Sequence, residues 1–420
     1  MKCEKVPISS IPKPMELFNA LEGPSFLLES REGPERKARI SIVGWDPEHD
    51  VIIKDDVALA LEELSRGSPL DTGTLYKGGP VGYVSYEAVE SWEDVKHKGV
   101  NDMGWPRGEF VVPKSFVIYD HILGVARICG ERKLESGRSG ELILSEPKLD
   151  VNRKEFIEWV EEIRRLEEEG EAIQVVISKS YTFEYKGDLR RLYEELAKIN
   201  PSPFMFHLRL KSGEIIGASP ELLYRVENGR LETFPIAGTR PRGSDPWEDI
   251  RLEEELKSDE KERAEHLMLV DLARNDLGKV ALPGTVKVSE FMFIEKYSHV
   301  QHLVSKVEAE LDPQFNAVDA LKATFPAGTV SGAPKPSAME IIGSLEKHQR
   351  GPYAGAVGFV DYSGNAEFAI TIRSFFARDG RLRAQAGAGI VYYSVPEREW
   401  EETEHKLRAL MKATVPFVRR

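Results

Sequence analysis

Most strand-like segments in the second half of this chain follow one another without helices between them. Only one helical pattern, at 188–199, interrupts a series of runs rich in β-branched and aromatic residues: 172–183, 204–210, 214–219, 221–226 and 230–238. Parallel strands need long crossover connections, so this order favours antiparallel pairing. A doubly wound nucleotide-binding fold would alternate more regularly, and no GxGxxG follows the first strand. We therefore predict an α+β fold with large, mostly antiparallel β-sheets packed face to face and flanked by helices.

The composition is that of a large globular protein. The 420 residues are 41% hydrophobic and carry a net charge of −13, which disfavours a non-specific nucleic-acid binder. No apolar run is long enough to span a membrane, and the first residues lack an apolar signal core. The two cysteines, Cys3 and Cys129, belong to no CxxC. We expect a soluble cytoplasmic protein, without nucleic-acid or membrane partners, a disulfide framework or a structural zinc site.

The chain changes character near residue 148. Short strand-like runs and turns fill the first part, and a helical pattern then begins with Phe156, Trp159 and Ile163 on one face. We predict an N-terminal region over 1–148 and a second domain over 149–420.

Two predicted helices carry carboxylates on one face. In the helix over 258–280, Asp259 is the expected N-cap and Gly278 the expected stop. Glu262 and Glu265 lie one turn apart at the edge of the expected apolar face, which is formed by Ala264, Leu267, Met268 and Leu272.

The last helix, from residue 394, is expected to start with a capping box formed by Ser394 and Glu397. Glu399, Glu402 and Lys406 share a stripe beside its buried face. Each pair of glutamates is either a solvated face of an acidic helix or half of a site for Mg²⁺, which prefers hard oxygen ligands. Spacing alone does not show that the two helices meet.

Glycine-containing loops supply a second signal. The stretch 325–335 contains no GxxxxGK[ST], so it is not a P-loop. Loops at Gly238, Gly328 and 387–389 can bring backbone N–H groups close to an anion, although each is also consistent with an ordinary turn. Together with Arg373 and the acidic helices, they favour a site for a compact, doubly anionic organic acid held by Mg²⁺.

Several ordered motifs carry a resemblance to a known family. They are LLES (27–30), NPSPFMF (200–206), GASPELL (217–223), PIAGTRPRG (235–243), EHLMLVDLARNDLG (265–278), YSHVQHLVS (297–305), FPAGTVSGAPK (325–335) and AGAGIV (386–391). They resemble the chorismate-utilising enzymes, and within these the large subunits (component I) of anthranilate synthases. The resemblance covers nearly all of 150–415 and makes 149–420 the expected chorismate-binding catalytic domain.

The resemblance implies a lyase of tryptophan biosynthesis that uses chorismate and ammonia to form anthranilate and pyruvate, with Mg²⁺ as cofactor. It makes Glu265 and Glu402 the expected direct metal ligands, supported by Glu262 and Glu399. Glu221 matches the general acid, and His302 matches a histidine linked to pyruvate elimination. The expected substrate contacts are Gly238, Thr239, Thr329, Tyr353, Arg373, Gly387, Gly389 and Lys406.

Two positions discriminate between members of the family. Gln174 stands where relatives that add water have a lysine, which disfavours an isochorismate or salicylate synthase. Ala237 stands where aminodeoxychorismate synthases typically have a lysine that can attack the ring, so direct attack by ammonia is favoured. A non-catalytic sensor on the same scaffold is opposed by the presence of Glu221, Glu265 and the other catalytic positions.

The family also implies regulation and a partner. Six residues match the pocket in which tryptophan acts as feedback inhibitor, and they make 1–148 a contributor to the regulatory site: Leu28, Glu29, Ser30, Pro203, Phe204 and Met205. Nothing in the sequence would hydrolyse glutamine, since neither Cys3 nor Cys129 has the signature of an activated nucleophile. The expected partner is a glutaminase subunit that supplies ammonia, in a heterotetramer of two large and two small subunits.

Overall fold

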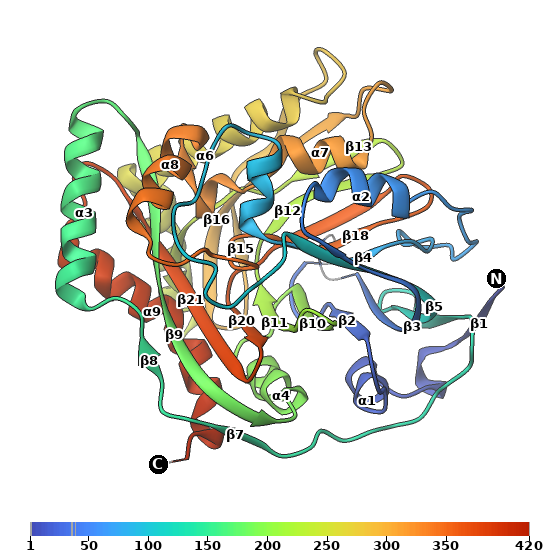
Figure 1. Cartoon of the computed structure of the whole chain (residues 1–420). Helices are drawn as coiled ribbons and strands as arrows, with labels where there is room; N and C mark the ends of the chain where they lie inside the picture. The colour runs from blue at the N-terminus through green and yellow to red at the C-terminus, as the bar shows by residue number, and fades with distance from the viewer. Residues whose placement is uncertain (1, 35–36, 38, 420) are drawn as a thin grey trace.

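A computed structural model describes residues 2–34, 37 and 39–419 of the chain. Within this part, 21 strands form one hydrogen-bonded network in which the paired strands are antiparallel. Helices flank this network on several sides (Figure 1). The predicted α+β class with antiparallel sheets and flanking helices is confirmed.

The strand network has two halves, which are connected by two long strands, β3 (Ile40–Ile53) and β5 (Gly108–Asp120). These two strands pair along most of their length. The first half follows the order β1 (Cys3–Pro7), β6 (Val125–Cys129), β5, β3, β2 (Ser25–Glu29), β10 (Phe204–Arg209), β11 (Glu214–Ser219), β20 (Ser374–Arg378), β21 (Arg381–Ile390) and β9 (Gln174–Gly187). Three short strands also pair with β9: β7 (Leu142–Leu144), β8 (Lys148–Leu149) and β17 (Gly332–Ala333).

The second half starts where β4 (Val81–Val84) pairs with the first residues of β5. It continues through β18 (Ala356–Val360), β19 (Ala366–Ile370), β12 (Leu222–Glu227), β13 (Arg230–Thr233) and β16 (Val300–Glu310), which also pairs with β14 (Ile236–Pro241) and β15 (Lys287–Lys296). Buried side chains of both halves, such as Phe26 and Phe359, belong to one hydrophobic core. The core therefore lies between the two halves, because each must remove one apolar face from water.

Helices cover the remaining apolar faces. They are α1 (Pro14–Asn19), α2 (Val57–Leu64), α3 (Arg153–Glu168), α4 (Arg190–Ile199), α5 (Pro246–Ser258), α6 (Glu260–Gly278), α7 (Ala317–Thr324), α8 (Lys335–Leu345) and α9 (Pro396–Thr414). A second core packs α1, α4 and α9 on the outer face of the first half, and a third packs α3, α8 and α9 against β9 and β21. Figure 1 shows α3 and α9 beside these two strands. None of the helices in the described ranges has the length and apolar character to cross a bilayer.

The predicted boundary between residues 148 and 149 falls within β8. Strands from both sides of it are paired, since β2 bonds to β10 and β4 bonds to β18. The N-terminal region therefore shares its sheet and its core with the second part of the chain.

The structure corrects two details of the predicted acidic helices. The N-cap of α6 is confirmed, because the Asp259 carboxylate accepts a hydrogen bond from the Glu262 N–H at 3.1 Å. Its buried stripe is different, since His266, Leu269 and Leu277 are buried while Leu267 is 47% exposed. The predicted stripe and the observed stripe both have helical spacing. Packing of α6 against β16 selects the observed stripe, and there the His266 ring contacts the Ser305 hydroxyl at 2.7 Å.

The predicted capping box of the last helix is wrong. The N-cap of α9 is Val395, with no side-chain cap. The Ser394 hydroxyl instead accepts a hydrogen bond from the Val391 N–H at 3.0 Å. The helix begins one residue later than expected, so Ser394 precedes the N-cap and its hydroxyl bonds the turn after β21.

Cys3 and Cys129 form a disulfide, contrary to the expectation from their spacing. They are cross-strand partners in the β1–β6 pair, with their Cα atoms 4.2 Å apart. The strand register brings together two residues that are separated by 126 positions, which spacing in the sequence does not show. The bridge closes a long loop and ties the first strand to the sheet.

We expect Cys3→Ser to lower the free energy of unfolding by about 2–5 kcal/mol, because the bridge restricts the unfolded chain. Denaturant unfolding with and without reductant measures this. Cys129→Ser should give the same loss, and neither variant should respond further to reductant. Equal unfolding midpoints for the oxidised wild type and both variants would show that the bridge does not stabilise the fold.

Candidate active site

Glu221 is a buried carboxyl group between β11 and β12, and it is only 8% exposed. The Thr329 hydroxyl, in the short helical turn Gly328–Val330, donates a hydrogen bond to its Oε1 at 3.1 Å. Burial raises the pKa of Glu221 to about 7, although Thr329 and the ammonium groups of Lys37 and Lys406 lower it. Glu221 can therefore carry a proton near neutral pH.

His302 lies on β16, opposite Thr239 of β14. Its Nδ1 is 3.0 Å from the Thr239 hydroxyl and 3.2 Å from the Gly238 carbonyl oxygen. Burial lowers the pKa of His302 to about 4, as do the charges of Arg373 and Lys37, while the Gly238 carbonyl opposes the shift. The imidazole is thus neutral at physiological pH and can accept a proton.

The β14–β16 register shifts between Ala237 and Thr239, so Gly238 lies at a bulge with φ of +72°. A side chain there would be strained, and its Cβ would lie 3.0 Å from Oε2 of Glu262. The bulge therefore brings the backbone next to a carboxylate of α6. The Arg240 guanidinium, two residues after Gly238, is not available to bind an anionic ligand, because it pairs with the carboxylates of Glu255, Asp259 and Glu262.

Lys406 on α9 connects three parts of the site. Its Nζ donates a hydrogen bond to the Gly387 carbonyl oxygen at 2.8 Å and pairs with Glu402 at 2.7 Å. Its own carbonyl accepts a hydrogen bond from Arg373 at 2.8 Å. Arg373 has a φ of +52°, an uncommon backbone conformation for a residue with a side chain.

Tyr353 and Gln174 line the strand β21 where its glycines lie. A Cβ on Gly387 would lie 3.0 Å from the Tyr353 hydroxyl oxygen, and a Cβ on Gly389 would lie 2.6 Å from Nε2 of Gln174. The two glycines therefore leave space that these side chains use. Burial raises the pKa of Tyr353 to about 12, so its hydroxyl remains a hydrogen-bond donor.

The four predicted metal-binding glutamates lie on the two helices that face this space. Gln174 donates a hydrogen bond to Oε1 of Glu265 at 3.1 Å, which joins α6 to β9. Burial raises the pKa of Glu265, and the charges of Glu262 and Glu402 raise it further. Burial and Glu402 raise the pKa of Glu399 to about 7. The charge of Glu402 on α9 thus acts on Glu265 of α6.

The donors on α6 and α9 are carboxylates, the ligand type that a divalent cation prefers, and they repel one another. Among the described residues, no group of three or more His, Cys, Asp or Glu side chains is close enough to hold a metal ion. Glu402 is paired with Lys406 instead. Mg²⁺ commonly binds through one or two carboxylates together with an anionic substrate and water, which this donor set could supply.

Two cavities are lined by residues that the sequence predicts to bind ligands. One, with about 410 Å³ of space, adjoins Glu221, Gly328 and Thr329 and extends to Leu269 and Leu272 of α6. It offers an apolar wall beside the buried acid. Of the predicted substrate residues, Thr329 contacts Glu221 directly and Lys406 acts on it by charge. Arg373 is bonded to the Lys406 carbonyl oxygen, and its charge acts on Tyr353.

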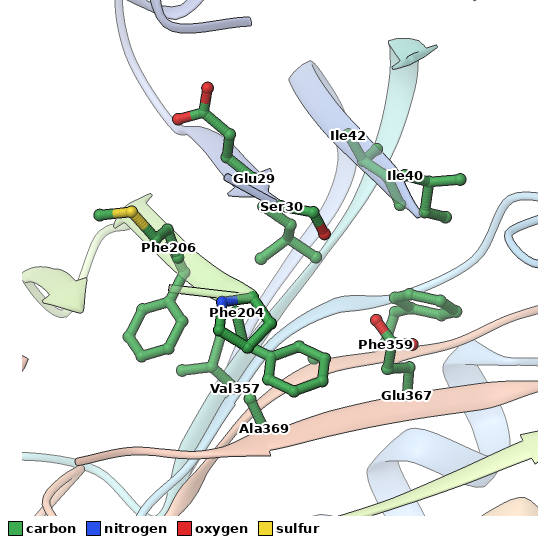
Figure 2. Close-up of a pocket in the computed structure, with 14 residues that line it drawn as sticks. Glu29, Ser30, Ile40, Ile42, Phe204, Phe206, Val357, Phe359, Glu367 and Ala369 are labelled. Atoms are coloured by element: carbon green, nitrogen blue, oxygen red, sulfur yellow. The ribbon is translucent and has the colours of Figure 1, made fainter. Parts of the chain in front are cut away.

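The second cavity lies between the two halves of the sheet and also has about 410 Å³. All six residues predicted for tryptophan line it: Leu28, Glu29, Ser30, Pro203, Phe204 and Met205. Figure 2 shows Phe204, Phe206 and Val357 gathered below Ser30. The Glu29 carboxylate accepts hydrogen bonds from Tyr193 at 2.6 Å and Arg31 at 2.9 Å.

Two buried cations near the site were not found from the sequence. Lys37 pairs with Glu295 at 2.6 Å. Arg350 donates hydrogen bonds to the Val330 and Val176 carbonyl oxygens, both at 2.7 Å, and so joins two segments that carry site residues. Neither has a sequence signal of its own, because a single Lys or Arg is usually a solvated surface residue.

Comparisons with known proteins concern the chain as a whole. A family model described as chorismate binding enzyme matches residues 23–412. The chain is 49% identical to anthranilate synthase component 1 of Saccharolobus solfataricus, over 97% of this chain and 98% of that protein. It is 47% identical to the protein of the same name in Aeropyrum pernix, over 98% and 95%.

Solved structures agree as well. Anthranilate synthase component I from Streptococcus pneumoniae superimposes with a TM-score of 0.81 at 32% identity, covering 97% of this chain and 99% of that one. The menaquinone-specific isochorismate synthase from Escherichia coli has a TM-score of 0.79 at 19% identity, covering 98% and 94%, and shares the fold.

The raised pKa of Glu221 predicts a pH-dependent stability. Between pH 4.5, its ordinary pKa, and about 7 the folded protein holds a proton that the unfolded chain loses, so this group reduces stability as pH rises through that window. We expect Glu221→Gln to be more stable than the wild type at pH 8, by up to about 3 kcal/mol, and to lose this advantage near pH 4.

Urea unfolding at both pH values measures the effect, with Glu397→Gln on the exposed side of α9 as the matched control. If the free energy of unfolding differs between Glu221→Gln and the wild type by the same amount at pH 4 and pH 8, the raised pKa of Glu221 is contradicted.

Proposed function

Because this chain belongs to the chorismate-binding enzyme family, we propose that it is the large subunit of an anthranilate synthase. In this reaction, chorismate and ammonia give anthranilate, pyruvate and water. The observation that carries the proposal is full-length similarity to proteins named anthranilate synthase component 1, at 49% identity for the Saccharolobus protein.

Glu221 is the proposed general acid. Amination of the ring expels the C4 hydroxyl, which leaves far more easily as water than as hydroxide. A carboxyl group with a pKa of about 7 can donate that proton and be reprotonated at neutral pH. The Thr329 hydroxyl, which donates to Oε1, leaves the second oxygen to carry the proton.

His302 is the proposed base of the elimination half. Loss of pyruvate requires removal of a ring proton, and a neutral imidazole can accept it. Its Nδ1 contacts the Thr239 hydroxyl and the Gly238 carbonyl, so Nε2 is the nitrogen left for the substrate.

Arg373, Tyr353 and Lys406 are the proposed holders of the substrate carboxylates. Burial lowers the pKa of the Arg373 guanidinium, which marks a cation placed in a poorly solvated position. An anionic ligand would offset that cost. Tyr353 supplies a neutral donor beside it.

Glu265 and Glu402 are the proposed ligands of Mg²⁺, with Glu262 and Glu399 holding its water shell. The bound ion would neutralise the ring carboxylate and the glutamates that face it. The pKa values of Glu265 and Glu399 are raised, so their ionised forms are destabilised. A bound cation would stabilise these ionised carboxylates, which supports the proposal.

Ammonia is proposed to come from a separate glutaminase subunit, in a complex of two large and two small subunits in the cytoplasm. Both cysteines of the chain are joined in the disulfide, which leaves no free thiol to attack glutamine. The name component 1 of the relatives is consistent with a second component.

The cavity between the sheet halves is proposed to bind tryptophan as a feedback inhibitor. Its apolar lining suits an indole, and Glu29 and Ser30 offer polar groups at one side. Inhibition requires that tryptophan bind more tightly to a state that accepts chorismate poorly.

The product formed from chorismate, Mg²⁺ and ammonium tests the proposed activity. We expect the purified chain to form anthranilate, detected by its blue fluorescence, and to form none from glutamine alone. Formation of 4-amino-4-deoxychorismate or isochorismate would contradict the assignment.

Ala237→Lys tests the direct attack by ammonia. Ala237 is 8% exposed beside the Gly238 bulge, so a lysine would place a long cation in the site. We expect kcat/KM for anthranilate to fall about tenfold or more. Ala237→Ser, a small neutral control, should stay near the wild-type rate. An undiminished rate in the lysine variant would mean that Ala237 does not decide how the ring is attacked.

Ser30→Phe tests the regulatory cavity. A phenyl ring would fill part of the space, so we expect at least about tenfold more tryptophan to be needed for half-inhibition. The rate without tryptophan should stay at the wild-type level. The control is Ser68→Phe, at an exposed serine away from the cavity, which should change neither the rate nor the inhibition. Unchanged inhibition in Ser30→Phe would mean that tryptophan binds elsewhere.

A further inference from the structure

Arg350 is an arginine whose side chain is fully inaccessible to solvent. It lies between α8 and β18, and its guanidinium donates two hydrogen bonds to the carboxylate of Glu346, at 2.9 and 2.8 Å. Two further N–H groups donate to the backbone carbonyl oxygens of Val330 and Val176, both at 2.7 Å. The buried charge is thus paired and hydrogen-bonded, and it reaches two other segments of the chain.

The two segments that Arg350 bonds carry residues of the proposed site. Val330 directly follows Thr329, whose hydroxyl bonds the proposed general acid at 3.1 Å. Val176 lies on β9 two residues after Gln174, whose side chain bonds a proposed metal ligand at 3.1 Å. One guanidinium therefore connects the backbone beside the proposed acid with the backbone beside the proposed metal site.

Glu346 extends the same network to the strand ladder. Its Oε1 accepts hydrogen bonds from the Ser178 N–H at 2.8 Å and from the Ser178 hydroxyl at 2.7 Å. Ser178 lies opposite Gly387 in the β9–β21 pair, and the Gly387 carbonyl oxygen accepts the hydrogen bond from Lys406. The carboxylate that pairs with Arg350 therefore also holds β9 opposite a proposed substrate contact.

The turn that contains Arg350 is held by a second buried carboxylate, Glu87. Glu87 lies in the short helix Tyr86–Ser91 and accepts hydrogen bonds from the Arg350 N–H at 2.7 Å and the Gly351 N–H at 2.9 Å. The turn leads to Tyr353, whose N–H donates to the Arg350 carbonyl oxygen at 3.3 Å. The guanidinium carbon of Arg350 lies 5.5 Å from the centre of the Tyr353 ring. A residue of the N-terminal region thus fixes the turn that presents Tyr353.

Stability alone does not account for an ion pair at this place. Buried ion pairs are often no better for stability than apolar residues of similar volume. A guanidinium, however, presents its donors in a planar fork with fixed directions, so it sets the positions of a carboxylate and two carbonyl groups together. Because the bonded segments carry proposed site residues, this rigidity favours a role in the geometry of the site.

We propose that Arg350, paired with Glu346, is a positioning residue of the active site: it holds the Thr329 turn, the start of β9 and the Tyr353 turn in the arrangement that binds the substrate. This inference rests on the proposed function, in which Thr329 and Tyr353 contact chorismate. In this role Arg350 acts through the backbone of the three segments. A displacement of about 1 Å in such groups can reduce the rate on the order of a hundredfold.

Steady-state kinetics of the double variant Arg350→Met with Glu346→Gln is the direct test. This variant leaves no unpaired charge at the ion pair, so its effect is not that of an orphaned ion. We expect KM for chorismate to rise and kcat to fall, each by at least about tenfold, because the Tyr353 turn and the Thr329 turn both lose a bond. Arg350→Lys keeps the charge without the planar fork, and it should restore neither constant.

Glu87→Gln separates the two turns and is a milder change, so it tests the proposal even if the double variant does not fold. The amide oxygen still accepts one hydrogen bond, but the amide nitrogen cannot accept the other. We expect KM for chorismate to rise about threefold or more with kcat nearly unchanged. Only the Tyr353 turn loses a bond, and Tyr353 is proposed to bind a carboxylate that is present in the ground state and the transition state alike. A fall in kcat without a rise in KM would contradict the proposal.

A matched control uses Arg190 at the start of α4. Arg190 pairs with Asp188 at 2.8 Å and donates hydrogen bonds to the carbonyl oxygens of Asn19 and Leu21, at 2.8 and 3.2 Å. The double variant Arg190→Met with Asp188→Asn should lower the unfolding midpoint without changing KM or kcat. Equal kinetic losses in the two double variants would overturn the proposal, as would unchanged constants in the Arg350 double variant.

Hydrogen–deuterium exchange of the unliganded full chain gives a readout that does not depend on the reaction. We expect the amides of 328–331 and of Gly351 to exchange at least about tenfold faster in the Arg350 double variant than in the wild type, and to be unchanged in the Arg190 control. Unchanged exchange in the Arg350 double variant would overturn the proposal. If the wild type forms no anthranilate, the proposed function fails, while the exchange rates still decide whether Arg350 holds these segments.

Discussion

The pairing of β9 with β21 is the constraint on which the rest of the site depends. The whole of β21 is paired with β9, from Arg381 opposite Glu184 to Ile390 opposite Val175. This register places the glycines of β21 against the residues that follow Gln174. Because α9 follows β21 and returns to it through the Lys406 contact with Gly387, the same ladder brings the second acidic helix to the site. The hydrogen bond from Gln174 to Glu265 brings the first acidic helix, α6, to the site.

Water exclusion then determines the electrostatics. Glu221 and His302 are ordinary titratable groups whose pKa values move in opposite directions because burial disfavours the charged form of each. One remains a protonated acid and the other a neutral base at the same pH, as acid–base chemistry in a single site requires. Arg373 and Lys37 are buried cations, and we propose that Arg373 holds a carboxylate of the substrate.

Much of the fold and the site followed from local patterns. Runs of strand-forming residues predicted the antiparallel sheets, and Asp259 was recognised as the N-cap of α6. Ordered motifs supplied the predicted site residues, several of which are in contact in the structure. The prediction of the α6 face was wrong because two stripes of that helix have the same spacing, and only contact with β16 selects one. The Ser394 capping box was wrong because the serine bonds the preceding turn.

The sequence by itself determined the class of fold, the family and the residues that we propose to carry the chemistry, because these depend on residue type and local order. The tertiary structure alone decided which distant groups meet. It pairs Cys3 with Cys129 through strand register, joins α6 to β9 through Glu265 and Gln174, and joins α9 to β21 through Lys406 and Gly387. It also buries Lys37 beside Glu295. Such contacts depend on where strands separated by long stretches of chain lie in the folded sheet, and neither residue spacing nor composition encodes that distance.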